Sequence, residues 1–270
     1  MAKGTGRASR ELIRVFDLNP WLWSLAMFAT MLLASHLGRR VGARKGQSDK
    51  DGSQILEGAI LNLLGLLLAF TFSGAVGRMD HRRDLILSEA NAIGTAYLRI
   101  DTLPKEDQPA LRMTFRKYAD ARLAYYHSLN DIAALAAIGQ ETNILESQIW
   151  KSAVSSSQKS PSPATMSTLL PAINDMFDIA TTRIVARQMH PPMVIYLLLA
   201  GIAVVSAFIA GLGFGPVPKS PMAWTIGYAL LMSAIFFVIL DIEHPRSGFF
   251  RVDDFDEVLV QARQAMESTP

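Results

Sequence analysis

Hydrophobic positions along the chain gather in four long runs that contain no Asp, Glu, Lys or Arg. A helix of about 20 apolar residues crosses the roughly 30 Å of hydrocarbon in a bilayer. Because lipid forces backbone polar groups to bond within their own segment, each run predicts a transmembrane helix. Buried helices of a large soluble core would explain one such run, but they explain four poorly. The runs are Leu18–Gly38, Gly58–Gly77, Gln188–Pro218 and Ser220–Leu240. The predicted spans are Trp21–Leu37, Ile55–Gly77, Met193–Phe214 and Met222–Leu240.

The stretch between the second and third spans is more polar, and its apolar positions recur at helical spacing. Leu111, Phe115 and Tyr118 in "LRMTFRKYADARLAYYHSL" illustrate this spacing, and no alternating strand pattern appears. The Ser- and Pro-rich segment 155–163 predicts a mobile loop, and Gly38–Ser53 predicts a polar hinge. The fold class expected is an all-α membrane protein with four transmembrane helices and a helical soluble bundle between spans two and three.

This pattern divides the chain into five consecutive regions. They are a basic N-terminal tail (1–17), spans one and two (18–77), a soluble helical region that continues span two (78–190), spans three and four (191–242), and an amphipathic C-terminal tail (243–270).

Composition agrees with a membrane protein and excludes several functions. Half of the residues are hydrophobic and the mean hydropathy is +0.22. The absence of cysteine excludes disulfides, thiol catalysis and thiolate metal sites. A net charge of +2 without a basic and aromatic patch gives no reason to expect nucleic acid binding. No phosphate loop, nucleophile elbow or His-Glu-x-x-His motif occurs, so we expect neither an enzyme nor a bound cofactor or metal.

The second span is unusual because its helical character does not stop at the membrane surface. The segment 65–99, "GLLLAFTFSGAVGRMDHRRDLILSEANAIGTAYLR", is apolar at its start and water-compatible from Asp84 onward. No proline interrupts it and its glycines occur singly. We therefore expect one helix that leaves the membrane and continues into the soluble region.

Two rows at four-residue spacing run along this span. Small residues form the first row, which permits close approach of another helix in lipid: Gly65, Ala69, Ser73 and Gly77. The second row passes from a polar residue through apolar ones to two cations: Asn62, Leu66, Phe70, Gly74, Arg78 and Arg82. It is either a lipid-facing or core stripe that ends in interfacial arginines, or the lining of a pore in an oligomer. Glu89, further along, either hydrogen-bonds a neighbouring helix or lines a vestibule.

Two segments together resemble the bestrophin-like family of bacterial membrane proteins. They are residues 67–99 and "LDIEHPRSGFFRV" after the last span. In the latter, Asp241, Pro245 and Gly248 form an Asp-x-x-x-Pro-x-x-Gly motif. The resemblance covers essentially the whole chain. It implies a more distant relation to bestrophin channels, which are pentamers of four-span subunits with cytoplasmic termini and an apolar neck on the second span.

By this resemblance Leu66 and Phe70 would form the pore neck, and Arg78 would match the arginine eight residues after the neck phenylalanine. The residues Asn62, Gly74, Arg82 and Glu89 would then line the pore or its vestibule. Two departures weaken the match to the channels. Met79, Asp80 and His81 replace paired tryptophans and a glutamate, and Gly74 replaces a large apolar neck residue.

The function expected is an oligomeric ion channel of a bacterial inner membrane, with lipid, further copies of the chain and small inorganic ions as partners. The alternative is a non-conducting membrane scaffold or sensor whose soluble bundle binds a partner. Four spans place both tails and the soluble region on one side. More basic residues near the spans lie on that side than on the other, which gives a weak preference for a cytoplasmic location, although the basic cluster in the short 38–53 loop opposes it. The resemblance also makes that side cytoplasmic.

Overall fold

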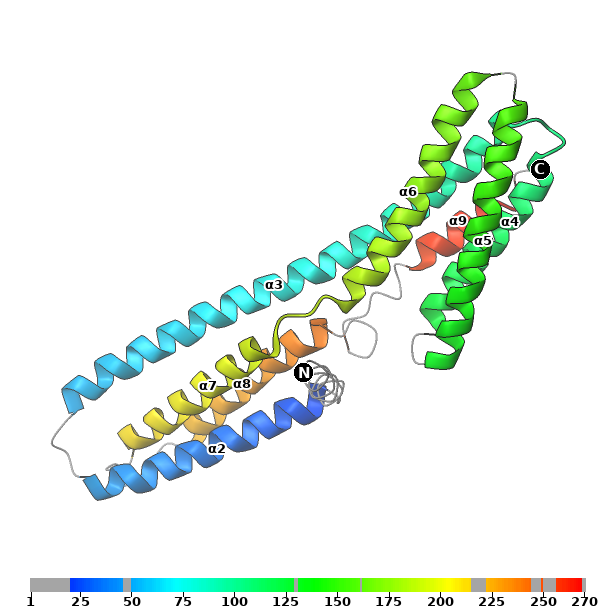
Figure 1. Ribbon diagram of the computed structural model, residues 1–270. Coiled ribbons are helices and arrows are strands. Elements are labelled where there is room, and N and C mark those ends of the chain that lie inside the picture. The colour runs from blue at the N-terminus through cyan, green and yellow to red at the C-terminus, as the bar shows by residue number, and fades with distance from the viewer. Residues whose placement is uncertain are drawn as a thin grey trace, which may run out of the picture. The chain divides into compact units, whose positions relative to one another are not determined.

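The computed structural model describes residues 20–45, 50–128, 131–160, 162–214, 222–243, 249 and 256–268. Within these ranges the protein is entirely helical and contains no strand (Figure 1). The helices are α2 (Pro20–Lys45), α3 (Lys50–Arg99), the 3₁₀ turn η1 (Ile100–Thr102), α4 (Gln108–His127), α5 (Ile132–Lys159), α6 (Pro163–Gln188), α7 (Met193–Phe214), α8 (Met222–Glu243) and α9 (Glu257–Ala265).

The four predicted spans are confirmed as helices that are long and apolar enough to cross a membrane. The qualifying segments are Pro20–Arg44, Glu57–Thr102, Pro163–Phe214, which comprises α6 and α7, and Met222–Glu243. The continuation of the second span is also confirmed, because α3 is a 50-residue helix without a break. The 3₁₀ turn η1 follows α3 directly and ends where Leu103 adopts an extended conformation, as the residue before Pro104 prefers.

The chain divides into two compact units. The first comprises Met1–Met79 and His190–Arg251, and the second comprises Asp80–Met189 and Val252–Pro270. Helix α3 contributes its first part to one unit and its last part to the other.

In the first unit α2 packs along α7 and α8 (Figure 1). Its apolar core includes Met31 from α2, Leu64 from α3 and Leu199 from α7, all at most 2% exposed. The backbones of α2 and α7 touch through glycine. A Cβ on Gly38 would lie 2.1 Å from the Phe208 carbonyl oxygen, and one on Gly211 would lie 2.2 Å from the Ser35 carbonyl oxygen. Only glycine permits this approach.

The second unit is a helical bundle of α4, α5, α6, α9 and the last part of α3. Its core is built from fully buried apolar side chains of four helices: Ile93 and Ala96 of α3, Phe115 and Tyr118 of α4, Ile149 of α5, and Ile173 and Met176 of α6. Helix α9 adds Leu259 to this core, as an amphipathic C-terminal tail would. Three hydrogen bonds to the Met266 carbonyl oxygen fix its end. The Tyr97 hydroxyl donates at 2.9 Å, Arg116 Nη2 at 2.7 Å and Arg116 Nε at 3.1 Å.

Two predicted connections are shorter than expected. The predicted loop 155–163 is wrong for its first part, since α5 continues to Lys159 and buries Ser156 and Ser157. Serine has only a modest helix propensity, and here the packing of the helix against its neighbours outweighs the preference of a Ser-rich segment for a loop. The predicted hinge Gly38–Ser53 is also too long, because α2 extends to Lys45 and α3 begins at Lys50. Close packing of Gly38 and Gly42 on α7 accounts for this extension.

Candidate functional site

Helix α3 is the least covered of the four apolar segments. Only 17% of its most apolar window is buried, against 28% to 39% in the other three. The two residues expected to form a neck are among its most exposed side chains: Leu66 is 54% exposed and Phe70 is 68% exposed. Asn62, one turn before Leu66, is exposed as well. We call these three residues, Asn62, Leu66 and Phe70, the exposed face of α3.

The small-residue row lies on the exposed part of the same helix. Gly65, Ala69, Ser73 and Gly77 are all exposed. A Cβ added at Gly65 or at Gly77 would meet no atom within 4 Å among the described residues. Within one chain, therefore, no described helix approaches this row closely.

The two cations of the second row turn toward their own chain. Arg78 Nε donates to Glu243 Oε1 of α8 at 2.8 Å, and its guanidinium forms an ion pair with that carboxylate, which is fully buried. Arg82 is 7% exposed and donates through Nη2 to the Met189 carbonyl oxygen at 2.9 Å, at the end of α6. Gly74 is half-buried against the Arg78 guanidinium, which would lie 3.2 Å from an added Cβ.

Helix geometry explains why this row does not stay on one face. Each four-residue step advances about 400° around a helix, so the row drifts by about 40° per step. Five steps from Asn62 to Arg82 therefore turn the side chain by roughly 200°. The start of the row is therefore exposed while Arg82, at its end, is buried within the same chain.

Glu243 also lies near the break between α6 and α7. Its Oε2 is 3.5 Å from Nδ1 of His190, a residue in the short segment before Pro191 and Pro192. Nearby, the fully buried Asp241 carboxylate accepts two hydrogen bonds from the Phe249 backbone N–H, at 2.9 and 2.8 Å. Asp241 is the first residue of the motif noted in the sequence. The other two members, Pro245 and Gly248, lie outside the described residues.

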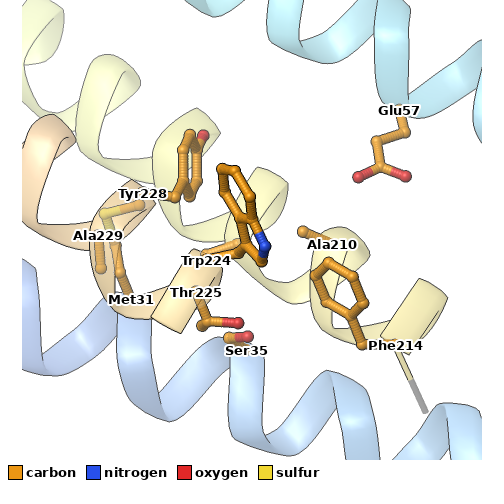
Figure 2. Close-up of a pocket in the computed structure, with 10 residues that line it drawn as sticks. Met31, Ser35, Glu57, Ala210, Phe214, Trp224, Thr225, Tyr228 and Ala229 are labelled. Carbon is orange, nitrogen blue, oxygen red and sulfur yellow. The ribbon is translucent and has the colours of Figure 1, made fainter. Parts of the chain in front are cut away.

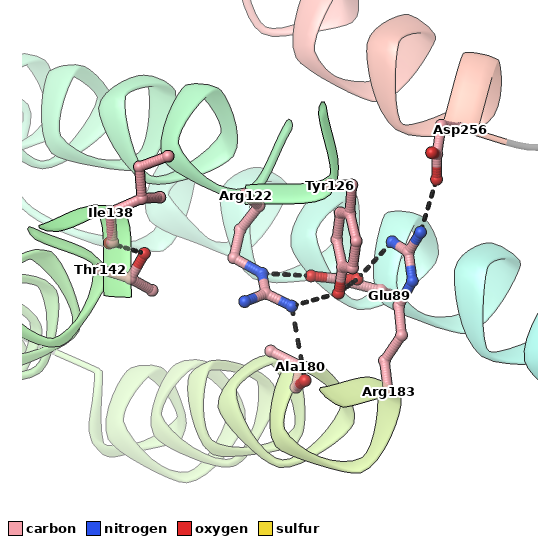
Figure 3. A network of polar contacts seen from close by, with 8 residues as sticks. All are labelled: Glu89, Arg122, Tyr126, Ile138, Thr142, Ala180, Arg183 and Asp256. Carbon is pink, nitrogen blue, oxygen red and sulfur yellow. Dashed lines mark hydrogen bonds and ion pairs between the residues drawn. The ribbon is translucent and has the colours of Figure 1, made fainter. Parts of the chain in front are cut away.

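Glu89 is fully buried inside the second unit, at the centre of an ionic network (Figure 3). Its Oε1 accepts from Arg122 Nε of α4 at 2.5 Å, and its Oε2 accepts from Arg183 Nη1 of α6 at 2.7 Å. The Tyr126 hydroxyl donates to Oε2 at 3.1 Å. Arg183 continues the network to Asp256, at the start of α9, with 2.5 Å between Nη2 and Oδ1. This placement favours the alternative in which Glu89 bonds neighbouring helices.

The network also shifts the ionisation of its partners. Burial alone would lower the pKa of the Arg122 guanidinium, but the Glu89 carboxylate raises it above its ordinary value. Burial, reinforced by the same carboxylate, raises the pKa of the Tyr126 hydroxyl. Arg183 stacks over the Tyr126 ring with its Cζ 3.5 Å from the centroid. The Arg122 guanidinium is therefore held in the charged form by the Glu89 carboxylate.

A second feature of the first unit is a cavity of about 210 Å³ between α2, α3, α7 and α8 (Figure 2). Most of its walls are apolar, including Met31, Phe214 and Trp224. Glu57 reaches toward it from α3, and the Tyr228 hydroxyl lies 2.6 Å from Ser206 Oγ. Its lining is too apolar to indicate an ion pathway.

Sequence reasoning did not find the partners of Glu89, Arg78 or Gly211. The glycine contact had a visible signal, since Gly38 and Gly42 are four residues apart and α7 carries Ala203, Ala207 and Gly211 at the same spacing. The ion pairs had none, because Arg78 and Glu243 are 165 residues apart.

Comparison with known proteins identifies the class. The bestrophin-like domain matches residues 25–255. No curated protein and no solved structure matches the chain. The chain belongs to the bestrophin-like family, and with its apolar helices it is a multi-pass membrane protein.

Proposed function

We propose that the protein is one subunit of an oligomeric ion channel in a bacterial inner membrane, with the exposed face of α3 lining the pore. The observation that carries the proposal is the exposure of Leu66 and Phe70 on the least covered apolar helix. Relation to bestrophin channels through the family supports the same assignment and suggests a pentamer.

In this arrangement Leu66 and Phe70 of each subunit form apolar rings around the symmetry axis. Hydrophobic constrictions of this kind can close a pore by excluding water. Asn62 lies one turn away on the same face and offers a polar ring beside the constriction.

The small-residue row provides the contact between subunits. Gly65, Ala69, Ser73 and Gly77 leave room for a second helix, and in lipid close backbone approach stabilises helix pairs through dispersion contacts. Because no described helix of the same chain uses this row, it suits a helix of the next subunit.

The roles of the charged residues follow from their partners. Since Glu243 engages Arg78 and the end of α6 engages Arg82, we assign both arginines to holding α3 against its own chain. Glu89 is assigned to the interior of the soluble bundle for the same reason. The unbroken α3 then links the neck to that bundle, so a change in one can be transmitted to the other.

A bilayer measurement tests the neck. The purified oligomer of the double variant Leu66→Ala, Phe70→Ala should conduct more than the native protein in planar bilayers or proteoliposome flux, because the wider constriction admits water. The matched control is Leu61→Ala, Phe72→Ala. It also removes one leucine and one phenylalanine, 37% and 43% exposed, from roughly the opposite side of α3.

The control should keep the native conductance. Equal conductance of the two double variants would overturn the assignment of the neck. Verified oligomers that stay silent in every form, over a range of salts and voltages, would favour the scaffold or sensor instead.

Orientation is a separate part of the proposal, in which both termini and 78–190 lie in the cytoplasm. Reporter fusions at Pro270 and between α5 and α6, at residues 160–162, should both be active as cytoplasmic fusions. Periplasmic activity at both sites would reverse the orientation and show that the basic cluster in 38–53 controls it.

A further inference from the structure

A cavity of about 290 Å³ lies in the second unit, between α4, α5 and α6. Unlike the cavity of the first unit, it is lined mainly by polar side chains. Its walls are Arg122, Tyr125, Gly139, Thr142, Asn143, Glu146, Ala180, Thr181 and Ile184. It shares Arg122 with the Glu89 network, on the side where Thr142 and Ala180 stand in Figure 3.

Arg122 brings a cationic donor to this cavity. The side chain is 1% exposed, and its Nε and Nη2 donate to Glu89, Tyr126 and the Ala180 carbonyl oxygen. The remaining nitrogen, Nη1, donates to no described residue and points away from Glu89 in Figure 3. Nη1 is not a buried atom without a partner, so water in the cavity can reach it. A guanidinium carries five N–H groups, and an acceptor on a ligand in the cavity would replace that water.

Glu146 brings an acid to the same cavity. It projects from α5 and is half-buried. Burial raises the pKa of its carboxyl, and the Arg122 guanidinium and the Tyr118 hydroxyl offset part of that rise. Thr142 also lines the cavity, and its Oγ1 already donates to the Ile138 carbonyl oxygen at 2.8 Å, so this hydroxyl is left to accept a further hydrogen bond. The cavity therefore offers one cation, one acid and a hydroxyl acceptor within a small volume.

We propose that this cavity binds a small zwitterion of the free amino acid class. Its carboxylate accepts from Arg122 Nη1, and its ammonium group pairs with Glu146. A ligand with only a negative charge would meet the Glu146 carboxylate, and one with only a positive charge would meet the buried guanidinium. Because a water molecule occupies about 30 Å³, the cavity holds roughly ten non-hydrogen atoms, which fits a free amino acid.

This site goes beyond the proposed channel, since it lies wholly in the second unit and requires no ion conduction. A ligand held by α4, α5 and α6 would stabilise the bundle in its bound arrangement.

Thermal unfolding of the full-length protein in detergent, followed by calorimetric titration of any hit, tests the proposal. The probes are the twenty free amino acids. For each hit, two analogues serve as controls: its methyl ester, which lacks the carboxylate, and its deaminated acid, which lacks the ammonium group. At least one free amino acid should raise the melting temperature, and both analogues should bind at least tenfold more weakly.

Two variants locate the site. Gly139 lines the cavity and has no atom within 4 Å of an added Cβ, so Gly139→Leu should place its side chain in the cavity and abolish binding. Gly94→Leu is its control, because Gly94 is equally open but lies outside the cavity. Glu146→Gln should weaken binding tenfold or more, whereas Glu141→Gln on the same helix should not.

Three results would overturn the proposal. They are no binding of any amino acid to the native protein, binding that survives Gly139→Leu, and deaminated acids that bind as tightly as the amino acid. The last result would identify a simple carboxylate site instead. Unchanged melting temperatures of the unliganded variants would establish that each variant is folded.

Discussion

The two halves of α3 differ in how many of their side chains are buried by the rest of the same chain. From Leu85 to Arg99 the helix is packed into the second unit, with Ile93 and Ala96 at 0% exposure and Glu89 in contact with two arginines. From Leu61 to Gly77 most side chains are exposed, although the segment is far more apolar. The apolar side chains of the first half therefore require lipid or a further subunit to cover them, whereas those of the second half are covered by their own chain.

The largest expected effect on thermal stability comes from disrupting the buried half of α3, from Leu85 to Arg99. Glu89→Gln removes the charge that compensates two buried guanidiniums, and breaking such a pair costs about 3–5 kcal/mol because the remaining charges stay desolvated. We expect a large fall in the melting temperature of the detergent-solubilised protein. Asp84→Asn, an exposed carboxylate on the same helix, should change it little. Equal stability of the two variants would mean that the network does not hold the bundle together.

A smaller effect is expected where glycines are compared. Gly211→Ala places a Cβ 2.2 Å from the Ser35 carbonyl oxygen, so α2 and α7 must separate. Overpacking of this kind costs about 1–3 kcal/mol. Gly65→Ala on the exposed half of α3 meets no described atom and should stay within about 0.5 kcal/mol of the native protein. Thermal unfolding of both variants in detergent measures the contrast.

The smallest effect on a single chain, and the sharpest test of the exposed half, comes from enlarging the small-residue row. Ala69→Leu or Ser73→Leu should leave the fold of each subunit unchanged, because both positions are exposed. Either change should dissociate the oligomer if this row contacts a neighbouring subunit. Size-exclusion chromatography with light scattering reports the mass. An oligomer of native mass and stability would indicate that the row faces lipid.

Local patterns were sufficient to predict much of this fold. Hydropathy over about 20 residues located all four spans, and the absence of proline between Lys50 and Arg99 predicted the helix that continues beyond the membrane. Helical spacing likewise predicted the soluble helices. Composition misplaced the ends of α2 and α5, since Gly42 and Ser156 belong to helices whose packing depends on distant segments.

The sequence by itself determined the four apolar helices, the uninterrupted α3 and membership of the bestrophin-like family, because each depends on residues close together or on a match along the chain. Only the tertiary structure decided which arginines form ion pairs within the chain and which residues of α3 remain exposed. Arg78 meets Glu243 and Arg183 meets Asp256 across separations of 165 and 73 residues. Burial makes those charges seek a partner, but no local pattern specifies which distant residue supplies it.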